Sequence, residues 1–184
     1  SATDVRAAAG EQVESLGAKF IMTEALKDAS GAGGYARELT PEEQKAQAEL
    51  VAGHISKQDV VITTALIPGR PAPRLVTAAM VASMAPGSVI VDLAAERGGN
   101  VELTRPNEVV VTPNGVTIIG YTNFAGRVPT SASQLYARNL LSFIDTLVDK
   151  KEKALAINWD DELVKATVLT REGRIVHPNI KVPE

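Results

Sequence analysis

The sequence predicts an α/β fold, in which a parallel sheet with flanking helices is followed by a C-terminal helix and a small β annex. Short β-branched runs have the composition of buried strands, at 59–64, 88–94, 108–112 and 116–120. Helical segments alternate with the earlier runs, as in a βαβ sheet. The chain is 45% hydrophobic but only 4% aromatic, which indicates an aliphatic core of helices packed on strands.

The chain opens with the pattern of a strand end, a helix and a second strand, over 2–6, 7–16 and 19–23. Asp4 lies at the first strand tip, so this order matches the second half of a dinucleotide-binding βαβ unit, without its first βα unit. A carboxylate there accepts hydrogen bonds from the adenosine ribose and repels a 2′-phosphate, which favours NAD over NADP. The alternative is that Asp4 only caps the following helix. The Gly-x-Gly-x-x-Gly of such a unit does not occur in the sequence.

Two helices are predicted from their ends. In the first, Val13 and Leu16 lie three residues apart and are expected to face inward, and Gly17 suits a left-handed cap. The second is expected over 41–55, because Thr40 is a good N-cap and is followed by Pro at the first helical position and Glu at the third.

A glycine-rich segment, 30–36, contains a single aromatic residue, Tyr35. A tyrosine between glycines is what a flap that closes over a ligand would contain. The alternative is a flexible surface loop. The segment is not a phosphate-binding P-loop, because no Gly-Lys-Ser/Thr follows it.

The stretch 59–73 is the centre of the prediction. Its apolar start, 60–62, suits a strand buried on both faces, and the small residues and prolines that follow form a stiff, irregular loop. A buried strand that ends in such a loop is typical of the ligand-binding edge of an α/β sheet. The alternative is an ordinary strand-to-helix connection. Thr77 then caps a short helix over 78–84.

Polar residues also follow the later strands. Asp92 ends one strand, and Glu96 and Asn100 lie just beyond it. The two carboxylates act either as acid–base groups or as supports that orient Arg97 and loop amides. Loop structure is favoured, because no His or Lys accompanies them. Residues 113–115, Pro-Asn-Gly, predict a tight turn between two strands. Asn123 follows the second of these, and its amide can both donate to and accept from a carboxamide or ribose.

The end of the chain changes character after a long helix over 131–148. Its expected apolar stripe consists of Leu135, Leu140, Leu141, Ile144, Leu147 and Val148. We expect 1–148 to be the C-terminal part of a nucleotide-binding domain. Residues 149–184 are then a β-rich tail, with Trp159 as an anchor, that packs against an N-terminal domain outside this chain. The alternative is a hairpin that closes the same domain.

Composition narrows the functional classes. The net charge is −3 with scattered signs, so no basic stripe suits nucleic acid. The chain contains no Cys and only two His, far apart, so no metal site is expected. No apolar run reaches the length of a membrane span, so no membrane insertion is expected, and a cytoplasmic location is the default.

The chain resembles the NAD(H)-binding component (domain I, alpha subunit) of proton-translocating nicotinamide nucleotide transhydrogenase, in the superfamily that includes alanine dehydrogenase. The segments that carry the resemblance are 3–6, 11–17, 33–36, 63–73, 86–94 and 121–123. The resemblance implies a dimeric, Rossmann-like component that passes hydride from NADH to NADP⁺. The NADP(H) is held by a partner domain, and a separate membrane domain moves protons.

The resemblance also implies functional residues. The family's NAD(H) site is matched by Asp4, Val5 and Arg6 at the adenosine ribose, by Gly34, Tyr35 and Ala36 in a mobile loop, and by Thr64, Ala65 and Leu66 in a strand-end segment. Residues that orient the nicotinamide belong to the family's other half, so no catalytic residue is assigned in this chain. Hydride transfer between two nicotinamides needs ordered approach of the rings and exclusion of water rather than an acid or base.

The resemblance further implies a location in the bacterial cytoplasm, at the inner membrane through partner subunits. Two other functions stay open from the sequence. One is an alanine dehydrogenase-like oxidoreductase that uses NAD, with substrate-binding residues from outside this chain. The other is a non-catalytic Rossmann module that serves only for interaction.

Overall fold

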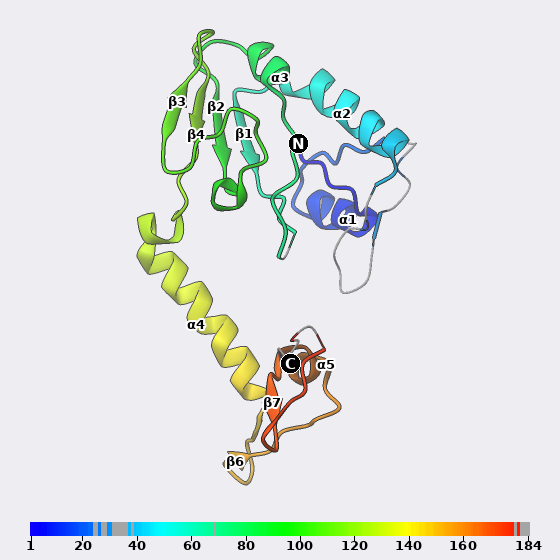
Figure 1. Cartoon of the computed structure of the whole chain (residues 1–184), viewed down its shortest axis with the longest axis vertical. Coiled ribbons are helices and arrows are strands. Elements are labelled where there is room, and N and C mark those ends of the chain that lie inside the picture. The colour runs from blue at the N-terminus through cyan, green and yellow to red at the C-terminus, as the bar shows by residue number, and fades with distance from the viewer. Residues whose placement is uncertain are drawn as a thin grey trace. The chain divides into compact units, whose positions relative to one another are not determined.

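A computed structural model describes residues 1–23, 26, 29–30, 37, 39–67, 69–178 and 180. The chain divides into two compact units, Ser1–Phe124 and Ala125–Glu184 (Figure 1). The first contains α1 (Ala7–Ser15), α2 (Pro41–Ile55), β1 (Val60–Thr63), α3 (Ala78–Ala82), β2 (Val89–Asp92), η2 (Ala95–Arg97), β3 (Val109–Val111) and β4 (Thr117–Ile119). The second contains η3 (Ala125–Arg127), α4 (Pro129–Asp145), β5 (Val148–Asp149), β6 (Ala154–Leu155), α5 (Glu162–Thr167), β7 (Thr170–Arg171) and β8 (Arg174–Ile175).

The first unit is built on a four-stranded sheet in the order β1-β2-β4-β3 (Figure 1). The pairs β1–β2 and β2–β4 are parallel, and β3–β4 is an antiparallel hairpin. The predicted turn of this hairpin is confirmed, with Gly115 at a φ of 81°. The α/β class with a mainly parallel sheet is therefore confirmed, and the carboxyl ends of β1, β2 and β4 lie at one edge of the sheet.

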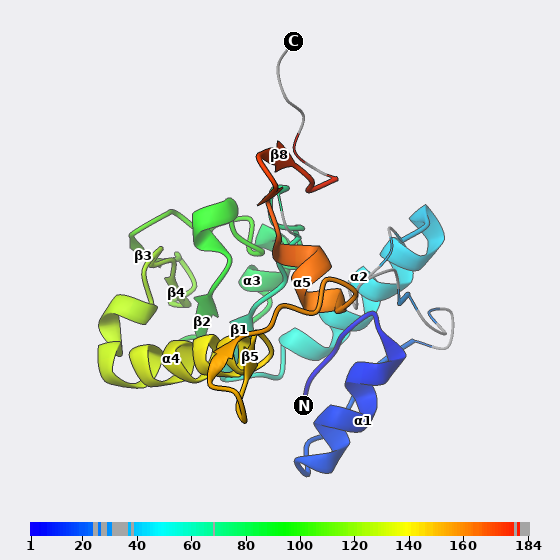
Figure 2. The same ribbon diagram turned by 90° about the horizontal axis from the view of Figure 1, so that it is seen from below.

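One face of the sheet forms the core. The register places one residue from each strand in a row across this face: Val61, Ile90, Ile118 and Val110. This row packs against Ile55 of α2 and against Met80 and Val81 of α3. Helices α2 and α3 contact each other and lie beside the sheet (Figure 2). Burial of such aliphatic side chains contributes about 1.5–3 kcal/mol each.

The opposite face of β1 is exposed, so the prediction that this strand is buried on both faces was wrong. Val60 and Ile62 are 61% and 62% exposed. The cause is that α2 and α3 cover only the face that carries Val61. Composition alone shows that a strand is apolar, but the neighbouring elements determine which of its faces are covered.

Helix α1 lies in the first unit beside a single parallel bridge, Ala2 to Phe20, which is all that forms of the strand expected at 19–23. The helix packs through Gly10, where an added Cβ would lie 2.9 Å from the Phe20 ring. Leu16 is 86% exposed, so the prediction that it faces inward was wrong. It lies at the C-cap, beyond the turn that packs. Gly17 takes a φ of 77°, which confirms the left-handed cap.

Helix α2 begins and ends where it was predicted to. Its start is fixed by a capping box, in which Thr40 and Glu43 each bond the other's backbone N–H. The Thr40 hydroxyl accepts a hydrogen bond from the Glu43 N–H at 3.2 Å, and the Glu43 carboxylate accepts one from the Thr40 N–H at 2.9 Å. Arg37 pairs with Glu43, Nη2 to Oε1, at 2.7 Å. The hydrogen bond from Arg37 and the backbone bond from Thr40 lower the pKa of Glu43 to about 2.

The described residues of the second unit form almost no core of their own. None of the residues of α4, all of which the structure describes, is buried. Among the described residues of this unit, Val164 is the only buried hydrophobic side chain. Within the tail that was expected to be β-rich, α5 forms instead of a strand, because Asp161 accepts from the N–H groups of Leu163 and Val164 at 2.8 and 3.2 Å. The guanidinium of Arg171 stacks on Trp159 at 4.1 Å.

Candidate functional site

The candidate site lies at the sheet edge where the parallel strands end. Thr63 and Asp92 are paired in register at the last positions of β1 and β2, and β4 ends beside them at Ile119. The segment Thr64–Leu66 leaves β1 at this edge, and the loop that contains Asn123 leaves β4 there. Loops at the carboxyl ends of parallel strands are the common place for ligands in open α/β sheets.

Asp92 organises this edge from below the surface. Its carboxylate is fully buried and accepts hydrogen bonds from four neutral donors. The donors are the Thr63 hydroxyl (3.1 Å), the Ala94 N–H (3.0 Å), the Val101 N–H (3.1 Å) and the Thr104 hydroxyl (2.6 Å). These bonds offset the cost of burying the carboxylate and hold the β2 loop closed on the β1 tip. Asp92 therefore supports loop amides, the role that the sequence favoured, and it is not exposed as an acid or base.

Asn100 connects this loop to the strand-end segment. Its side chain, fully buried, accepts from the Ala65 N–H at 3.0 Å and donates to the Ala65 carbonyl at 2.9 Å. The same amide donates to the Pro73 carbonyl at 2.8 Å. Thr64 and Leu66, on either side of Ala65, are exposed. Residue types and spacing did not reveal this role, since Asn100 and Ala65 are far apart in the sequence.

Asp4 and Arg6 form a closed pair at the start of the chain. Asp4 Oδ1 accepts from the Arg6 N–H and Nε, both at 2.9 Å, and Oδ2 accepts from Nη2 at 2.7 Å. This guanidinium lowers the pKa of Asp4, and the carboxylate raises the pKa of Arg6. Arg6, not Asp4, is the N-cap of α1, so the capping alternative for Asp4 is wrong. The Asp4 side chain stays 30% exposed.

The contacts in the structure bring only some of the remaining predicted site residues together. Val5 bonds through its carbonyl to the Ala29 N–H at 2.9 Å. In the described part of the chain, Asp4 forms no hydrogen bond or ion pair with the strand tips. The predicted loop residues Gly34, Tyr35 and Ala36 lie outside the described residues.

The β4 loop is braced beside its exposed Asn123. Tyr121 and Phe124 pack edge to face, with ring centroids 5.9 Å apart. The Asn107 side chain accepts from the Thr122 N–H and hydroxyl at 3.2 and 2.7 Å. The loop therefore presents the Asn123 position from a supported backbone.

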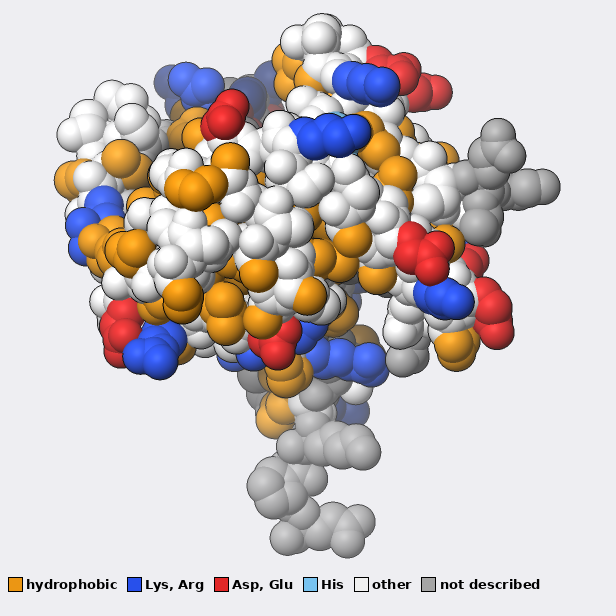
Figure 3. Space-filling model, turned by 90° about the horizontal axis from the view of Figure 1, so that it is seen from above, with side chains coloured by type: hydrophobic (Ala, Val, Ile, Leu, Met, Phe, Trp, Pro, Cys, Tyr) orange, Lys and Arg blue, Asp and Glu red, His pale blue; other side chains and the backbone are white. Residues whose placement is uncertain are grey.

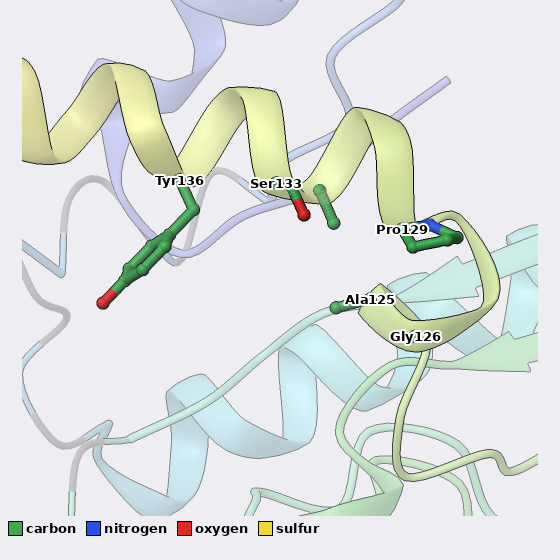
Figure 4. Close-up of a pocket in the computed structure, with 6 residues that line it drawn as sticks. Ala125, Gly126, Pro129, Ser133 and Tyr136 are labelled. Carbon is green, nitrogen blue, oxygen red and sulfur yellow. The ribbon is translucent and has the colours of Figure 1, made fainter.

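A separate hollow lies in the second unit, where α4 faces η3 (Figure 4). Its volume is about 330 Å³, and it is lined by Ala125, Gly126, Pro129, Ala132, Ser133 and Tyr136. Ser133 and Tyr136 bring the only polar side-chain atoms of this lining, and none of the predicted site residues contributes to it. All of its lining residues belong to the second unit.

In the described part of the chain, the distribution of charged and apolar residues points to no second functional site. Figure 3 shows acidic and basic side chains interspersed over one face rather than gathered by sign. Among the described residues, no group of three His, Cys, Asp or Glu side chains is placed to hold a metal ion. No helix within the described ranges is both long enough and apolar enough to span a membrane.

Known families, sequences and solved structures match this chain. The family model "Alanine dehydrogenase/PNT, C-terminal domain" matches residues 1–178. An NAD(P) transhydrogenase subunit alpha protein of Rhodospirillum rubrum is 55% identical over 96% of this chain and 46% of its own length. The NAD(P) transhydrogenase subunit alpha of Cereibacter sphaeroides is 46% identical over 96% of this chain and 34% of its own. Alanine dehydrogenase 1 of Staphylococcus aureus is 35% identical over 74% of this chain and 37% of its own.

Solved structures agree with these relatives. The transhydrogenase from Sinorhizobium meliloti is 56% identical, with a TM-score of 0.67 over 95% of this chain and 44% of that chain. An L-alanine dehydrogenase is 26% identical, with a TM-score of 0.62 over 96% of this chain and 43% of that chain. The chain thus spans less than half the length of these relatives. The resemblance read from the sequence is confirmed, and the chain belongs to the alanine dehydrogenase/PNT family.

Proposed function

We propose that the chain is the C-terminal part of the NAD(H)-binding component of a proton-translocating transhydrogenase. The observation that carries this proposal is the supported strand-tip edge, with Thr64 and Leu66 exposed on either side of the fixed Ala65. The names of the relatives at 55% and 46% identity favour a transhydrogenase. In the complete component, the edge would hold the adenosine side of NAD(H).

The Asp4–Arg6 pair supports the choice of NAD(H). Arg6 lowers the pKa of Asp4, so the carboxylate is ionised near neutral pH. A fixed, partly exposed carboxylate accepts hydrogen bonds from ribose hydroxyls and repels a 2′-phosphate. Val5 and Arg6 would contact the same sugar, and Asn123 would bind a polar group from the β4 loop. Gly34, Tyr35 and Ala36 would close over the bound nucleotide.

The reaction would place modest demands on this chain's side chains. NADH supplies the hydride when it is bound, and NADP(H) would be held by a partner domain. The residues of this chain would bind, orient and shield the adenosine end, which agrees with the absence of an assigned acid or base. The component would form a homodimer and lie at the bacterial inner membrane through partner subunits, one of which moves protons.

The second unit supports assembly into a larger protein. Leu135, Leu140, Leu141 and Ile144 of α4 are 44–63% exposed. Relatives are more than twice as long as the segment that this chain matches. The β-rich tail, 149–184, is proposed to pack against a part of the protein that lies outside this chain, which would cover such apolar side chains.

Calorimetry on the intact polypeptide that carries this chain tests the proposal. NADH should bind more tightly than NADPH, because the 2′-phosphate meets the Asp4 carboxylate. Equal affinity for both would overturn the NAD(H) assignment, and no binding of either would favour the non-catalytic interaction module. Oxidation of L-alanine with NAD would instead support the function named for the Staphylococcus aureus relative.

A further inference from the structure

We propose that Asn100 is a positioning residue for nucleotide binding, because it fixes both ends of the loop that lines the strand-tip site. The inference rests on the proposed NAD(H) function and adds a residue that does not touch the nucleotide itself. Asn100 acts through Ala65 at the start of the loop and through the backbone at 73–76 at its end.

The start of the loop is held by a two-point contact. The Asn100 side chain accepts a hydrogen bond from the Ala65 N–H at 3.0 Å and donates one to the Ala65 carbonyl at 2.9 Å, as the backbone of a neighbouring strand would. The Ala65 N–H is therefore used within the protein, and a ligand meets the flanking residues instead. Thr64 and Leu66 are exposed there, Leu66 by 50%.

The end of the loop is held by the same residue. The Asn100 side chain donates to the Pro73 carbonyl at 2.8 Å. Its own carbonyl accepts from the N–H groups of Leu75 and Val76 at 2.8 and 3.1 Å. A single buried residue thus closes the loop at both ends, which reduces the conformational freedom that binding would otherwise remove.

Asn100 is itself held on both sides. The Val101 N–H donates to Asp92 Oδ2 at 3.1 Å. On the other side, Gly99 lies so close to Asp92 that an added Cβ would be 2.6 Å from Oδ2. The Asn100 backbone is therefore fixed relative to β2, and its amide transmits that position to the β1 tip.

The chemistry requires an amide of this size. Ala65 presents one donor and one acceptor, and Pro73 presents a second acceptor, so the side chain must both accept and donate. Asp can accept the Ala65 N–H but has no proton for the carbonyls when ionised, and Ala can do neither. Asn100→Asp should therefore release the loop by removing the donors alone, and Asn100→Ala by removing the donors and the acceptor.

Asn114 offers a matched control at the other end of the strands, in the β3–β4 turn. Its side-chain amide also donates to backbone carbonyls, those of Val81, Ala82 and Met84, at 3.2–3.3 Å. Asn114→Asp therefore makes the same chemical change at a distance from the strand tips. It should lower thermal stability without changing nucleotide affinity.

The experiment measures NADH affinity by calorimetry in the intact polypeptide for the wild type, Asn100→Asp, Asn100→Ala and Asn114→Asp. We expect the Kd for NADH to rise about tenfold in both Asn100 variants and to stay within about twofold of wild type in Asn114→Asp. Thermal melts establish that each variant folds, and amide exchange at Ala65 should accelerate in Asn100→Ala while β2 amides stay protected.

The outcomes separate this inference from the proposed function. If the wild type does not bind NADH, the proposed function fails and the inference fails with it. If the wild type binds and the Asn100 variants bind equally well, only the inference fails. An equal loss in Asn114→Asp would also overturn it, as a global effect, and so would failure of both Asn100 variants to fold, which would make the residue purely structural.

Discussion

The guanidinium of Arg6 donates two hydrogen bonds to the carboxylate of Asp4, Nε to Oδ1 at 2.9 Å and Nη2 to Oδ2 at 2.7 Å. The pair sets the direction of the carboxylate before any ligand arrives. The hydrogen bond from Arg6 also lowers the pKa of Asp4. The carboxylate therefore keeps its negative charge at the pH values where an ordinary carboxyl group titrates, and loses it only as the pH falls through the lowered pKa.

Asp4→Asn should weaken NADH binding and reduce the preference for NADH over NADPH. The amide keeps the size of the side chain but loses the charge that repels a 2′-phosphate. Calorimetry with both nucleotides checks the ratio, for which we expect a loss of about tenfold. Asp59→Asn is the control, because Asp59 is an exposed acid directly before β1, at the opposite end of the strand. A ratio unchanged in Asp4→Asn would remove Asp4 from the site.

The first turn of α2 should lose stability in acid. The pKa of Glu43 is lowered to about 2 by the Arg37 hydrogen bond, below its ordinary 4.5. A carboxyl with a depressed pKa in the folded state stabilises fully above its unfolded pKa and progressively less as the pH falls toward the folded value. Thermal midpoints should therefore drop between about pH 4.5 and 2, and Arg37→Gln should reduce this slope.

A control for that titration lies on the same helix. Lys45 and Glu49 are 3.9 Å apart, but both side chains are at least 70% exposed, and such pairs contribute little. Lys45→Gln should leave the acid slope unchanged. A slope reduced as much by Lys45→Gln as by Arg37→Gln would show general charge repulsion rather than a specific Arg37–Glu43 pair.

Gly99→Ala should destabilise the first unit more than Gly98→Ala. Both glycines have positive φ, 82° and 95°, so Ala costs about 1–2 kcal/mol at either position. Only at Gly99 would the new Cβ meet Asp92, at 2.6 Å, and Thr104, at 3.0 Å, while nothing lies within 4 Å at Gly98. Overpacking of this kind adds about 1–3 kcal/mol.

Urea denaturation of the two variants measures this difference directly. The strain at left-handed φ is common to both, so subtraction isolates the contact with Asp92. Equal free energies of unfolding in the two variants would mean that the Asp92 network relaxes without cost, and the close approach at Gly99 would then not constrain the sequence.

Leu141→Ser should destabilise the intact polypeptide if the apolar stripe of α4 is covered there. The side chain is 60% exposed in this chain, so an effect of about 1–2 kcal/mol requires a surface beyond it. Differential scanning calorimetry measures the change, and Gln134→Ser on the same helix is the polar control. No difference between the variants would show that this face stays in solvent.

The sequence was sufficient for the order of helices and strands from α2 to β4, because strand composition and helix caps are local signals. Thr40 and the two glutamates after Pro41 located the start of α2, and Asn114-Gly115 located the hairpin turn. Asp161 shows the limit of such reading: its capping of α5 was missed because the β-prone residues that follow it suggested a strand.

The site was less accessible to sequence reasoning because its supports act over long separations. Asn100 was recognised only as a loop residue, and its bonds to Ala65 depend on how β1 and β2 pair. The exposure of Val60 and Ile62 likewise depends on which face of the sheet is covered, and an apolar run does not record that. In each case, local chemistry was read correctly and tertiary context was missing.

The scarcity of buried side chains among the described residues of the second unit has a consequence for how the protein accumulates in the cell. A segment with one buried hydrophobic residue among those described draws little free energy from its own packing. If this segment packs against another part of the same protein, as proposed above, its folded population depends on whether that part is folded, because the two are joined in one polypeptide. Copies in which that part is misfolded would leave the segment uncovered and would be the first that proteases remove.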